Sequence, residues 1–274
     1  MVIMKLFSLL IISFVIISPP AFSKTNQDSS LAYLVSKKQY EKLFPHRNAI
    51  YAYEDFITAS ASFPLFANEG DLLTRKRELI AFFANIAHET TSGWKESPGG
   101  AYFWGLVYVE ERDCKDGNCA QYNAAGTSKY RPVAGKSYHG RGPMQLSYAY
   151  NYGLAGEELS LPLLQEPELV STNGVIAFKT ALWFWMRDQK PKPSCHSVMC
   201  GKWEPTEDDI KQNRKPGFGM AINIINGGVE CNTTNPAIEE KRKERIGFYR
   251  WFAGIMKVNV EDDCDCAGMA AYGQ

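Results

Sequence analysis

The sequence lacks an excess of charge of either sign. Its 274 residues include 30 Lys and Arg and 30 Asp and Glu, which gives a formal net charge of zero, and no long block of like charges interrupts the chain. Proteins that bind polyanions usually carry a basic excess or a basic stripe. The composition therefore gives no support to a nucleic-acid partner and favours a neutral substrate.

The spacings typical of zinc sites are also missing. The chain has four histidines and seven cysteines, but no C-x-x-C pair and no histidine cluster. We therefore expect no metal and no cofactor. Seven cysteines in an exported chain suggest disulfides. Their clustering favours three bridges and one free thiol: Cys114–Cys119, Cys195–Cys200, and Cys231 with either Cys264 or Cys266.

Long hydrophobic runs are absent after the N-terminus. Residues 1–23 combine one early lysine and a long apolar run with small residues, Ala21 and Ser23, placed like a cleavage site. A transmembrane anchor is disfavoured because the apolar core is short and a proline pair follows it. We expect a signal peptide over 1–23 and a secreted, extracellular mature protein with no membrane association.

Internal repeats and low-complexity linkers are missing as well. The 251 residues left after 274 − 23 have enough length for one large domain with a substantial core. We therefore expect a single, monomeric unit in which residues 24–266 form the functional domain. Residues 267–274 would be a short C-terminal tail.

Helical periodicity is the dominant pattern in the rest of the sequence. Apolar residues recur at three- and four-residue intervals and predict four helices, which begin at Tyr53, Lys76, Gly174 and Glu239. Stretches 95–143 and 187–220 are rich in Gly, Pro and Tyr, and we expect them to be long ordered loops. The alternating pattern over 101–114 is typical of a strand. The sequence thus predicts a mainly α-helical domain with long loops and a small β element.

One predicted helix carries a carboxylate along its apolar face. Leu79, Phe82 and Ile86 form an apolar stripe, and Glu89 follows three residues later. This carboxylate should lie at the edge of the core and at the negative end of the helix dipole, with Gly93 as a plausible terminating residue. Both surroundings disfavour the ionised form, as a general acid requires. For a lone glutamate in such a place, a frayed and solvated helix end is the more common explanation.

A second acidic group strengthens the functional interpretation. Glu110 and Glu111 follow the strand-like pattern and precede Arg112. Glycoside hydrolysis uses two carboxyl groups, one protonated on the leaving oxygen and one ionised. An aromatic content of 13% suits a carbohydrate cleft, although it fits a rich core equally well.

Four segments carry a resemblance to a known family. They read FFANIAHETTSGW (82–94), YHGRGPMQLSYAYNYG (138–153), FKTALWFWM (178–186) and INIINGGVEC (222–231). In this order they closely resemble the family 19 chitinases, and the likeness covers nearly the whole mature chain. The resemblance implies a lysozyme-like, two-lobed α-helical catalytic domain. It also implies an endo-acting chitinase whose partners are chitin and N-acetylglucosamine oligomers.

The resemblance assigns the reacting groups. Glu89 matches the catalytic acid of that family and Glu111 matches the base, whereas Glu110 is a bystander. The family inverts the anomeric centre, which implies carboxyl groups about 6.5–9.5 Å apart with a water between base and sugar. Ser147 matches the serine that helps hold this water, although a serine near a helix start is as often a cap.

Further matches concern the N-acetylglucosamine units and the acid. Gln145, Tyr150 and Asn151 match residues that hydrogen-bond the sugars, and Asn226 matches an asparagine that engages the acetamido group. Arg245 matches an arginine that bridges the acid and a supporting glutamate, here Glu230. Such an arginine would lower the pKa of Glu89, whereas burial and the helix dipole would raise it. The sequence leaves the direction of the net shift open.

Four more residues complete the expected substrate-binding set: His88, Tyr130, Tyr138 and Lys192. His88 fits a core histidine equally well, and a lysine between prolines is more often a solvated loop residue. Tyr130 stands where plant relatives carry Trp, so its smaller ring should weaken stacking on one sugar. His139 replaces the second tyrosine of a neighbouring family motif.

Two other functions stay open. A peptidoglycan-lysing glycosidase shares this kind of fold, but the intact HETT, GRGPMQLS and NIINGGVEC segments favour chitin. A catalytically inactive chitin-binding lectin would most simply lack one carboxylate. Both Glu89 and Glu111 are present.

Overall fold

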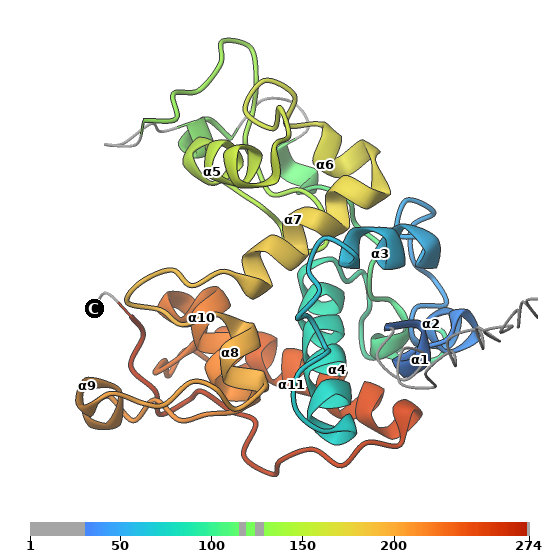
Figure 1. Ribbon diagram of the computed structural model, residues 1–274, viewed down its shortest axis with the longest axis vertical. Helices are drawn as coiled ribbons and strands as arrows, with labels where there is room; N and C mark the ends of the chain where they lie inside the picture. The colour runs from blue at the N-terminus through green and yellow to red at the C-terminus, as the bar shows by residue number, and fades with distance from the viewer. Residues whose placement is uncertain (1–30, 115–118, 124–128, 273–274) are drawn as a thin grey trace, which may run out of the picture.

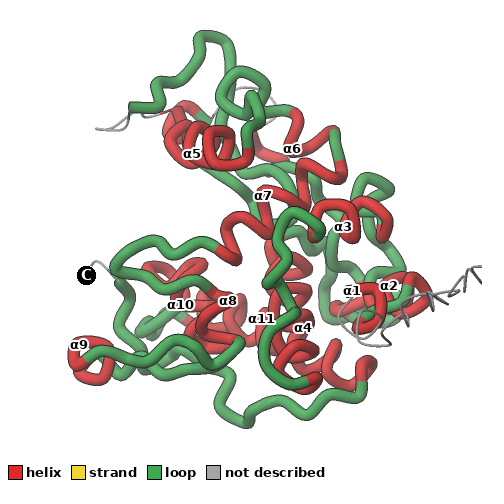
Figure 2. Tube along the Cα trace, viewed as in Figure 1, coloured by secondary structure: helices red, strands yellow, loops and turns green. Residues whose placement is uncertain are grey.

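The computed structural model describes residues 31–114, 119–123 and 129–272, so the expected signal peptide at 1–23 lies outside the described residues. Within these ranges the chain is mainly helical, as predicted (Figures 1 and 2). The β structure of the described residues consists of three isolated antiparallel bridges, between Glu110 and Arg141, Arg141 and Leu146, and Gln189 and Lys192. None of the described helices has the length and apolar character needed to span a membrane.

The helices form a large and a small lobe (Figure 1). The large lobe holds α1 (Leu31–Leu34), α2 (Lys37–Leu43), α3 (Tyr53–Ser60), α4 (Leu72–Glu89), α8 (Cys195–Met199), α9 (Glu207–Lys211), α10 (Phe218–Glu230) and α11 (Pro236–Met256). The small lobe holds α5 (Ala149–Leu159) and α6 (Leu169–Thr172), and α7 (Gly174–Met186) runs between the two lobes. Short 3₁₀ helices cover Ala101–Phe103, Arg112–Cys114 and Ala120–Asn123.

Helix α4 is the centre of the large lobe. The Asp71 carboxylate caps its start by accepting a hydrogen bond of 2.8 Å from the Thr74 N–H. Its apolar stripe is fully buried, and the ring of Phe82 packs edge-on against Trp185 of α7 with centroids 5.5 Å apart. On another side, α11 packs along α4. This packing fixes the direction in which the last turn of α4 points.

The C-terminal end of α4 differs from the prediction. The helix ends at Glu89, and Gly93 does not terminate it. Thr90 takes that role, because its hydroxyl donates to the Ile86 carbonyl at 2.6 Å and accepts from the Leu106 N–H at 3.0 Å. The Thr90 carbonyl also accepts from the N–H groups of residues 107 and 108. The segment that leads to Glu111 is therefore tied to the residue that follows Glu89.

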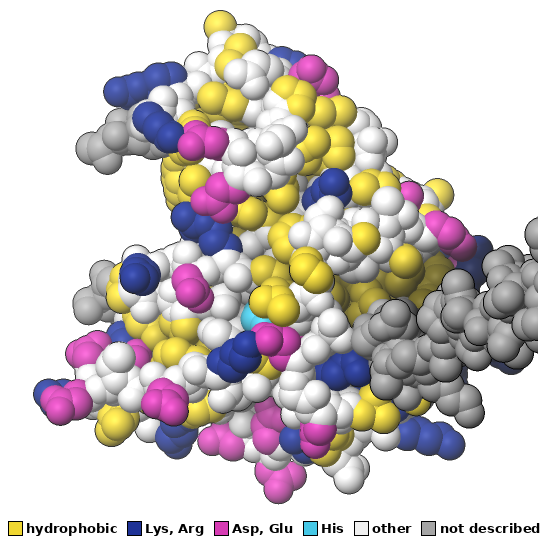
Figure 3. All heavy atoms as spheres, in the orientation of Figure 1, with side chains coloured by type: hydrophobic (Ala, Val, Ile, Leu, Met, Phe, Trp, Pro, Cys, Tyr) yellow, Lys and Arg dark blue, Asp and Glu magenta, His cyan; other side chains and the backbone are white. Residues whose placement is uncertain are grey.

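Helix α7 belongs to both cores. Phe178, Leu182 and Trp185 lie in the core of the large lobe, whereas Trp183 packs in the core of the small lobe. The Trp183 indole N–H donates to the Glu158 carboxylate of α5 at 2.6 Å. Figure 3 shows that the surface is hollowed between the lobes, on the side where α5 and α10 face each other.

Three further expectations are corrected. The strand expected over 101–114 is a 3₁₀ turn followed by an irregular segment with one bridge. The expected loop 187–220 contains α8, α9 and the start of α10. The Cys195–Cys200 bridge is not formed. The Cys195 thiol lies 4.0 Å from the Ala221 carbonyl, and Cys200 Sγ lies 3.9 Å from His196 Nε2. The bridges are Cys114–Cys119 and Cys231–Cys266, and Cys195, Cys200 and Cys264 are free.

The C-terminal tail packs onto the large lobe. Met269 and Ala271 are buried, and the Ala270 carbonyl accepts hydrogen bonds from Arg214 and Asn223. Tyr272 stacks on the Arg214 guanidinium, 3.9 Å from ring centroid to carbon. The residues after Cys266 up to 272 thus belong structurally to the domain.

Candidate active site

The Glu89 carboxylate is held at the end of α4 by a buried arginine. Arg245 Nη1 of α11 lies 2.7 Å from Glu89 Oε1, and Arg245 Nη2 lies 2.5 Å from Glu230 Oε1 of α10. Arg245 also donates to the Asn85 side chain at 3.0 Å. Glu89 keeps 19% of its side chain exposed, whereas Arg245 and Glu230 are buried. The arrangement leaves Glu89 as the accessible carboxylate of the three charged groups.

Burial and charge act in opposite directions on Arg245 and Glu230. Burial disfavours the guanidinium charge, but the carboxylates of Glu89 and Glu230 outweigh burial and raise the pKa of Arg245 above its ordinary value. Burial likewise opposes the charge of Glu230, yet Arg245 holds the pKa of Glu230 below its ordinary value. A second carboxylate therefore shares the positive charge that faces Glu89.

Asn226 and His88 flank this group. The Asn226 amide donates to Glu230 Oε1 at 2.9 Å from a kink in α10, where its backbone adopts φ −142° and ψ 30°. The kink turns this side chain toward the ion-pair group. His88 Nδ1 lies 3.3 Å from Glu244 Oε2 of α11. His88 is thus largely buried and lies against α11, beside the residue that carries the candidate acid.

Glu111 is positioned by the small lobe. Its N–H donates to the Gly140 carbonyl at 2.9 Å, and its neighbour Glu110 forms the bridge with Arg141. The Glu110 carboxylate lies 3.5 Å from His139 Nε2 and 3.6 Å from Arg141 Nε. The two adjacent glutamates thus point to different neighbours, and Glu110 is engaged with the segment 139–141.

Gly140 joins Glu111 to Ser147 and Gln145. A Cβ at Gly140 would lie 2.7 Å from Gln145 Oε1 and 3.3 Å from Ser147 Oγ, so the absence of a side chain lets both approach. Ser147 Oγ donates to the Gln145 carbonyl at 2.9 Å and does not cap α5. The Asn151 amide in turn donates to the Ser147 carbonyl at 2.9 Å. The segment therefore brings the predicted residues Ser147, Gln145 and Asn151 together beside Glu111.

Two tyrosines beside Glu111 were not predicted. The Tyr122 hydroxyl donates to Glu111 Oε1 at 3.3 Å, and burial raises the pKa of Tyr122 to about 12, so the hydroxyl keeps its proton. The ring of Tyr122 meets Tyr148 edge-on at 5.0 Å, and Tyr148 stacks on Tyr150 at 5.5 Å. Tyr148 and Tyr150 are exposed, by 37% and 41%. These aromatic faces extend from Glu111 toward solvent.

The other three predicted binding residues are engaged with neighbouring parts of the chain. Tyr138 is fully buried, and its hydroxyl donates to the Leu164 carbonyl at 2.7 Å, so it supports the small lobe and does not face a ligand. Tyr130 packs against Gly153 and donates to Glu157 at 2.7 Å on the outer side of α5. Lys192 donates to the Ile224 carbonyl at 3.1 Å, and burial lowers the pKa of Lys192. Lys192 therefore lies close to the kinked part of α10.

Potential metal ligands near Glu111 are already engaged. The Glu111 carboxylate lies near the sulfurs of Cys114 and Cys119, but these form a disulfide with each other. A second group of potential ligands, Glu69, His196 and Cys200, lies in the large lobe away from this site. The site chemistry therefore rests on carboxylates, an arginine, amides and hydroxyls, the groups that a glycosidase uses.

Known proteins resemble this chain over most of its length. The family described as Chitinase class I, glycoside hydrolase family 19, matches residues 34–266. Acidic endochitinase WIN6 of Populus trichocarpa is 45% identical over 90% of this chain and 72% of that protein. An inactive chitinase-like protein 1 of Hevea brasiliensis is 43% identical over 89% of this chain and 77% of that protein. Chitinase C of Streptomyces griseus superimposes with a TM-score of 0.68 at 34% identity, over 85% of this chain and 80% of that one. The chain therefore belongs to the chitinases of glycoside hydrolase family 19.

Proposed function

We propose that this protein is a secreted endochitinase that hydrolyses β-1,4 linkages between N-acetylglucosamine units with inversion at the anomeric carbon. The observation that carries the proposal is a pair of carboxylates, one held in each lobe. Glu89 is held by Arg245 in the large lobe, and Glu111 is held beside Ser147 by the small lobe. Glycoside hydrolysis uses two carboxyl groups, and here each lobe supplies one.

In this mechanism Glu89 protonates the glycosidic oxygen as the bond to the anomeric carbon breaks. Glu111 removes a proton from a water that attacks the opposite face of the sugar, and Ser147 helps to hold that water. The developing Glu89 carboxylate is stabilised by Arg245 at 2.7 Å. Arg245 also contacts Glu230, so two carboxylates share the guanidinium charge.

Substrate contacts are assigned to residues near these two groups. Gln145, Asn151 and Tyr150 lie beside Ser147, and Asn226 faces the group formed by Glu230 and Arg245. The exposed ring of Tyr148 adds an apolar face of the kind that stacks on a pyranose. His88 and Lys192 are assigned supporting positions, whereas the buried Tyr138 and the outward Tyr130 are not assigned substrate contacts.

The central test uses chitin hexamer and resolves the anomer of the first product by NMR. An inverting enzyme releases α-anomer from the β-linked substrate, and an initial β-anomer would contradict the mechanism. Glu111→Gln should reduce kcat by at least about a hundredfold, the usual scale of a lost general base. Glu110→Gln is the matched control, because the neighbouring carboxylate contacts His139 and Arg141 of the small lobe, and its activity should stay near that of the wild type.

An inactive chitin-binding protein is the second candidate, because one relative is named an inactive chitinase-like protein. Hydrolysis by the wild type no faster than by Glu89→Gln, with chitin binding retained in both, would support it. Peptidoglycan lysis is tested in parallel by comparing clearing of bacterial walls with release from colloidal chitin. We expect hydrolysis of chitin alone.

A further inference from the structure

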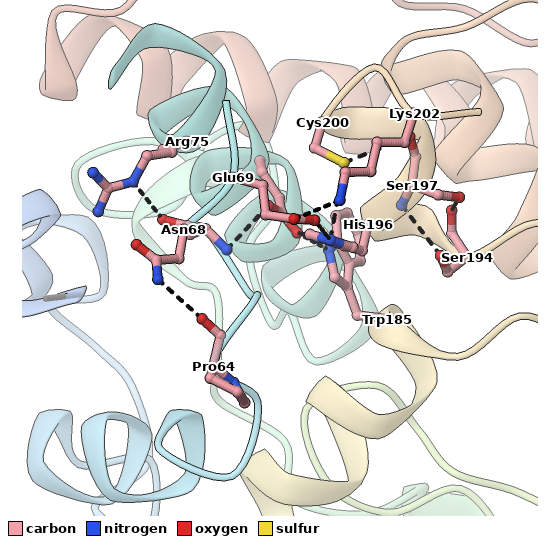
Figure 4. A network of polar contacts seen from close by, with 12 residues as sticks. Pro64, Asn68, Glu69, Arg75, Trp185, Ser194, His196, Ser197, Cys200 and Lys202 are labelled. Atoms are coloured by element: carbon pink, nitrogen blue, oxygen red, sulfur yellow. Dashed lines mark hydrogen bonds and ion pairs between the residues drawn. The ribbon is translucent and has the colours of Figure 1, made fainter. Parts of the chain in front are cut away.

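A cluster of potential metal ligands lies in the large lobe, apart from the active site (Figure 4). Glu69 precedes α4, His196 belongs to α8, and Cys200 follows α8 directly. One ligand atom from each, a carboxylate oxygen, Nε2 and Sγ, lies within 4.8 Å of the others. Glu69 Oε2 is 2.8 Å from His196 Nε2, and Cys200 Sγ is 3.9 Å from the same nitrogen. The three donors therefore converge on one point beside His196.

A buried carboxylate fixes the orientation of His196. Its Nδ1 lies 2.7 Å from Oε1 of the fully buried Glu78. Glu78 is itself held by the Trp185 indole N–H at 3.0 Å and by the Ala67 N–H at 3.0 Å. Metal-binding histidines usually donate their second ring N–H to such a carboxylate, which fixes the tautomer and leaves Nε2 free to coordinate. This arrangement orients His196 Nε2 toward Glu69 and Cys200.

We propose that Glu69, His196 and Cys200 bind a divalent transition-metal ion, with Zn²⁺ as the ion that suits the donor set. Zn²⁺ prefers thiolate, imidazole and carboxylate ligands in tetrahedral geometry. Bonds of about 2.3 Å to sulfur and about 2.0 Å to nitrogen place these two ligands about 3.6 Å apart. The 3.9 Å between Cys200 Sγ and His196 Nε2 therefore requires only a small adjustment. The fourth position is left to a water or to the second oxygen of Glu69.

Charge balance is compatible with this ion. Cysteine and histidine ligands lose their protons when a metal binds. Replacement of one proton on Cys200 Sγ and one on His196 Nε2 by Zn²⁺ leaves the total charge of the cluster unchanged. No other co-reactant is needed. The site would link the loop before α4 to α8, so a bound ion would stabilise the large lobe.

Lys202 is the natural competitor of the ion. Its ammonium lies 2.5 Å from Glu69 Oε1, and 56% of its side chain is exposed. Because that side chain is long and exposed, it can turn into solvent when the ion binds. Removal of Lys202 should therefore tighten metal binding, whereas removal of Glu69 or Cys200 should weaken it. A purely structural role for the ion-pair network would not give effects of opposite sign on metal affinity.

The experiment titrates the chelator-treated full chain with Zn²⁺ by calorimetry and with Co²⁺ by thiolate charge-transfer absorption. We expect the wild type to bind Zn²⁺ at one site and its Tm to rise on binding. Binding should be at least tenfold weaker in Cys200→Ser and in Glu69→Gln. It should be tighter in Lys202→Gln. Cys264→Ser is the matched control, since it removes another free cysteine outside the cluster, and it should bind as the wild type does.

Three results would overturn the site. These are no Zn²⁺ binding, binding equal to the wild type in a folded Cys200→Ser or Glu69→Gln variant, or a Co²⁺ spectrum that depends on Cys264. Circular dichroism before titration identifies any variant that fails to fold, and either ligand variant alone decides the question. The two proposals fail separately, because metal affinity is measured without substrate and the chitin assay is run with chelator.

Discussion

At the scale of single residues, Arg245 has the strongest structural constraint. It is buried between two carboxylates from different helices, and each of its three nitrogens contacts a neighbouring side chain. We expect Arg245→Gln to lower the free energy of unfolding by about 3–5 kcal/mol, because Glu230 would be left as an uncompensated buried charge. Urea denaturation measures this loss.

A double variant separates the charge effect from lost packing. Arg245→Gln combined with Glu230→Gln removes both charges, so it should recover part of the lost stability. Stability no better in the double variant than in Arg245→Gln alone would contradict the assignment of the loss to Glu230. Both variants should hydrolyse chitin poorly, because Glu89 loses its partner.

Tyr122 offers a second test at this scale. Its hydroxyl donates to the Glu111 carboxylate, and the residue lies outside every motif that the sequence pointed to. Tyr122→Phe removes the donor and keeps the ring against Tyr148, so we expect kcat to fall about tenfold, the equivalent of one hydrogen bond to a charged group. The exposed Tyr33 provides a matched Tyr→Phe control. An unchanged kcat in Tyr122→Phe would show that Glu111 is oriented by its backbone contact alone.

At the scale of elements, the tail and α9 form a unit that depends on pH. Burial opposes the charge of Asp209, but hydrogen bonds from Thr206 and Arg214 outweigh it and lower the pKa of Asp209 to about 2. Because the folded-state pKa is depressed, the stabilisation is present above the ordinary pKa and is lost as the pH falls toward about 2. A shift from the ordinary 3.8 to about 2 corresponds to about 2 kcal/mol.

The measurement compares the wild type with Asp209→Asn in urea. The wild type should be more stable at about pH 5, and the difference should shrink by about 2 kcal/mol as the pH approaches about 2. A difference that stays constant over this range would show that Asp209 acts through packing. Chains ending at Cys266 should lose only the part of this stabilisation that Tyr272 contributes, since Tyr272 donates to Asp209 at 2.8 Å while Thr206 and Arg214 stay in place.

Periodicity predicted the helices better than the irregular segments. The helix starts at Tyr53 and Gly174 are confirmed, and α4 and α11 begin only a few residues before the predicted Lys76 and Glu239. Their apolar stripes are long enough to define a face. The strand prediction over 101–114 was wrong because the backbone of this segment bonds to the Thr90 carbonyl and to residues 140–142 of the small lobe, and not to a neighbouring strand.

At the scale of the whole molecule, the sequence predicted local motifs better than contacts between residues that are distant in the chain. The helix pattern drew attention to Glu89, but its assignment as the acid and its contact with Arg245 followed from the family resemblance. The cluster of Glu69 and His196 could not be found from spacing, because the two residues lie 127 positions apart. Tyr138 was misjudged for a related reason, since its burial depends on Leu164 and on packing in the small lobe.

The two disulfides allow a final prediction at this scale. Cys231–Cys266 closes a separation of 35 residues that contains all of α11, whereas Cys114–Cys119 closes a separation of 5. In the chain-entropy description, the long loop is worth about 4 kcal/mol and the short one about 2 kcal/mol. All four cysteines are buried, so replacement by serine costs similar desolvation at each site. The comparison therefore isolates the effect of loop length.

We expect the Cys231→Ser/Cys266→Ser variant to lose about 2 kcal/mol more unfolding free energy in urea than Cys114→Ser/Cys119→Ser. It should also lose activity at a lower temperature, because α11 carries Arg245 to Glu89. The short bridge follows Glu111 and closes only a local loop, so its loss should leave global stability closer to that of the wild type. An equal or reversed order of the two losses would mean that native-state packing, and not the unfolded chain, determines what these bridges contribute.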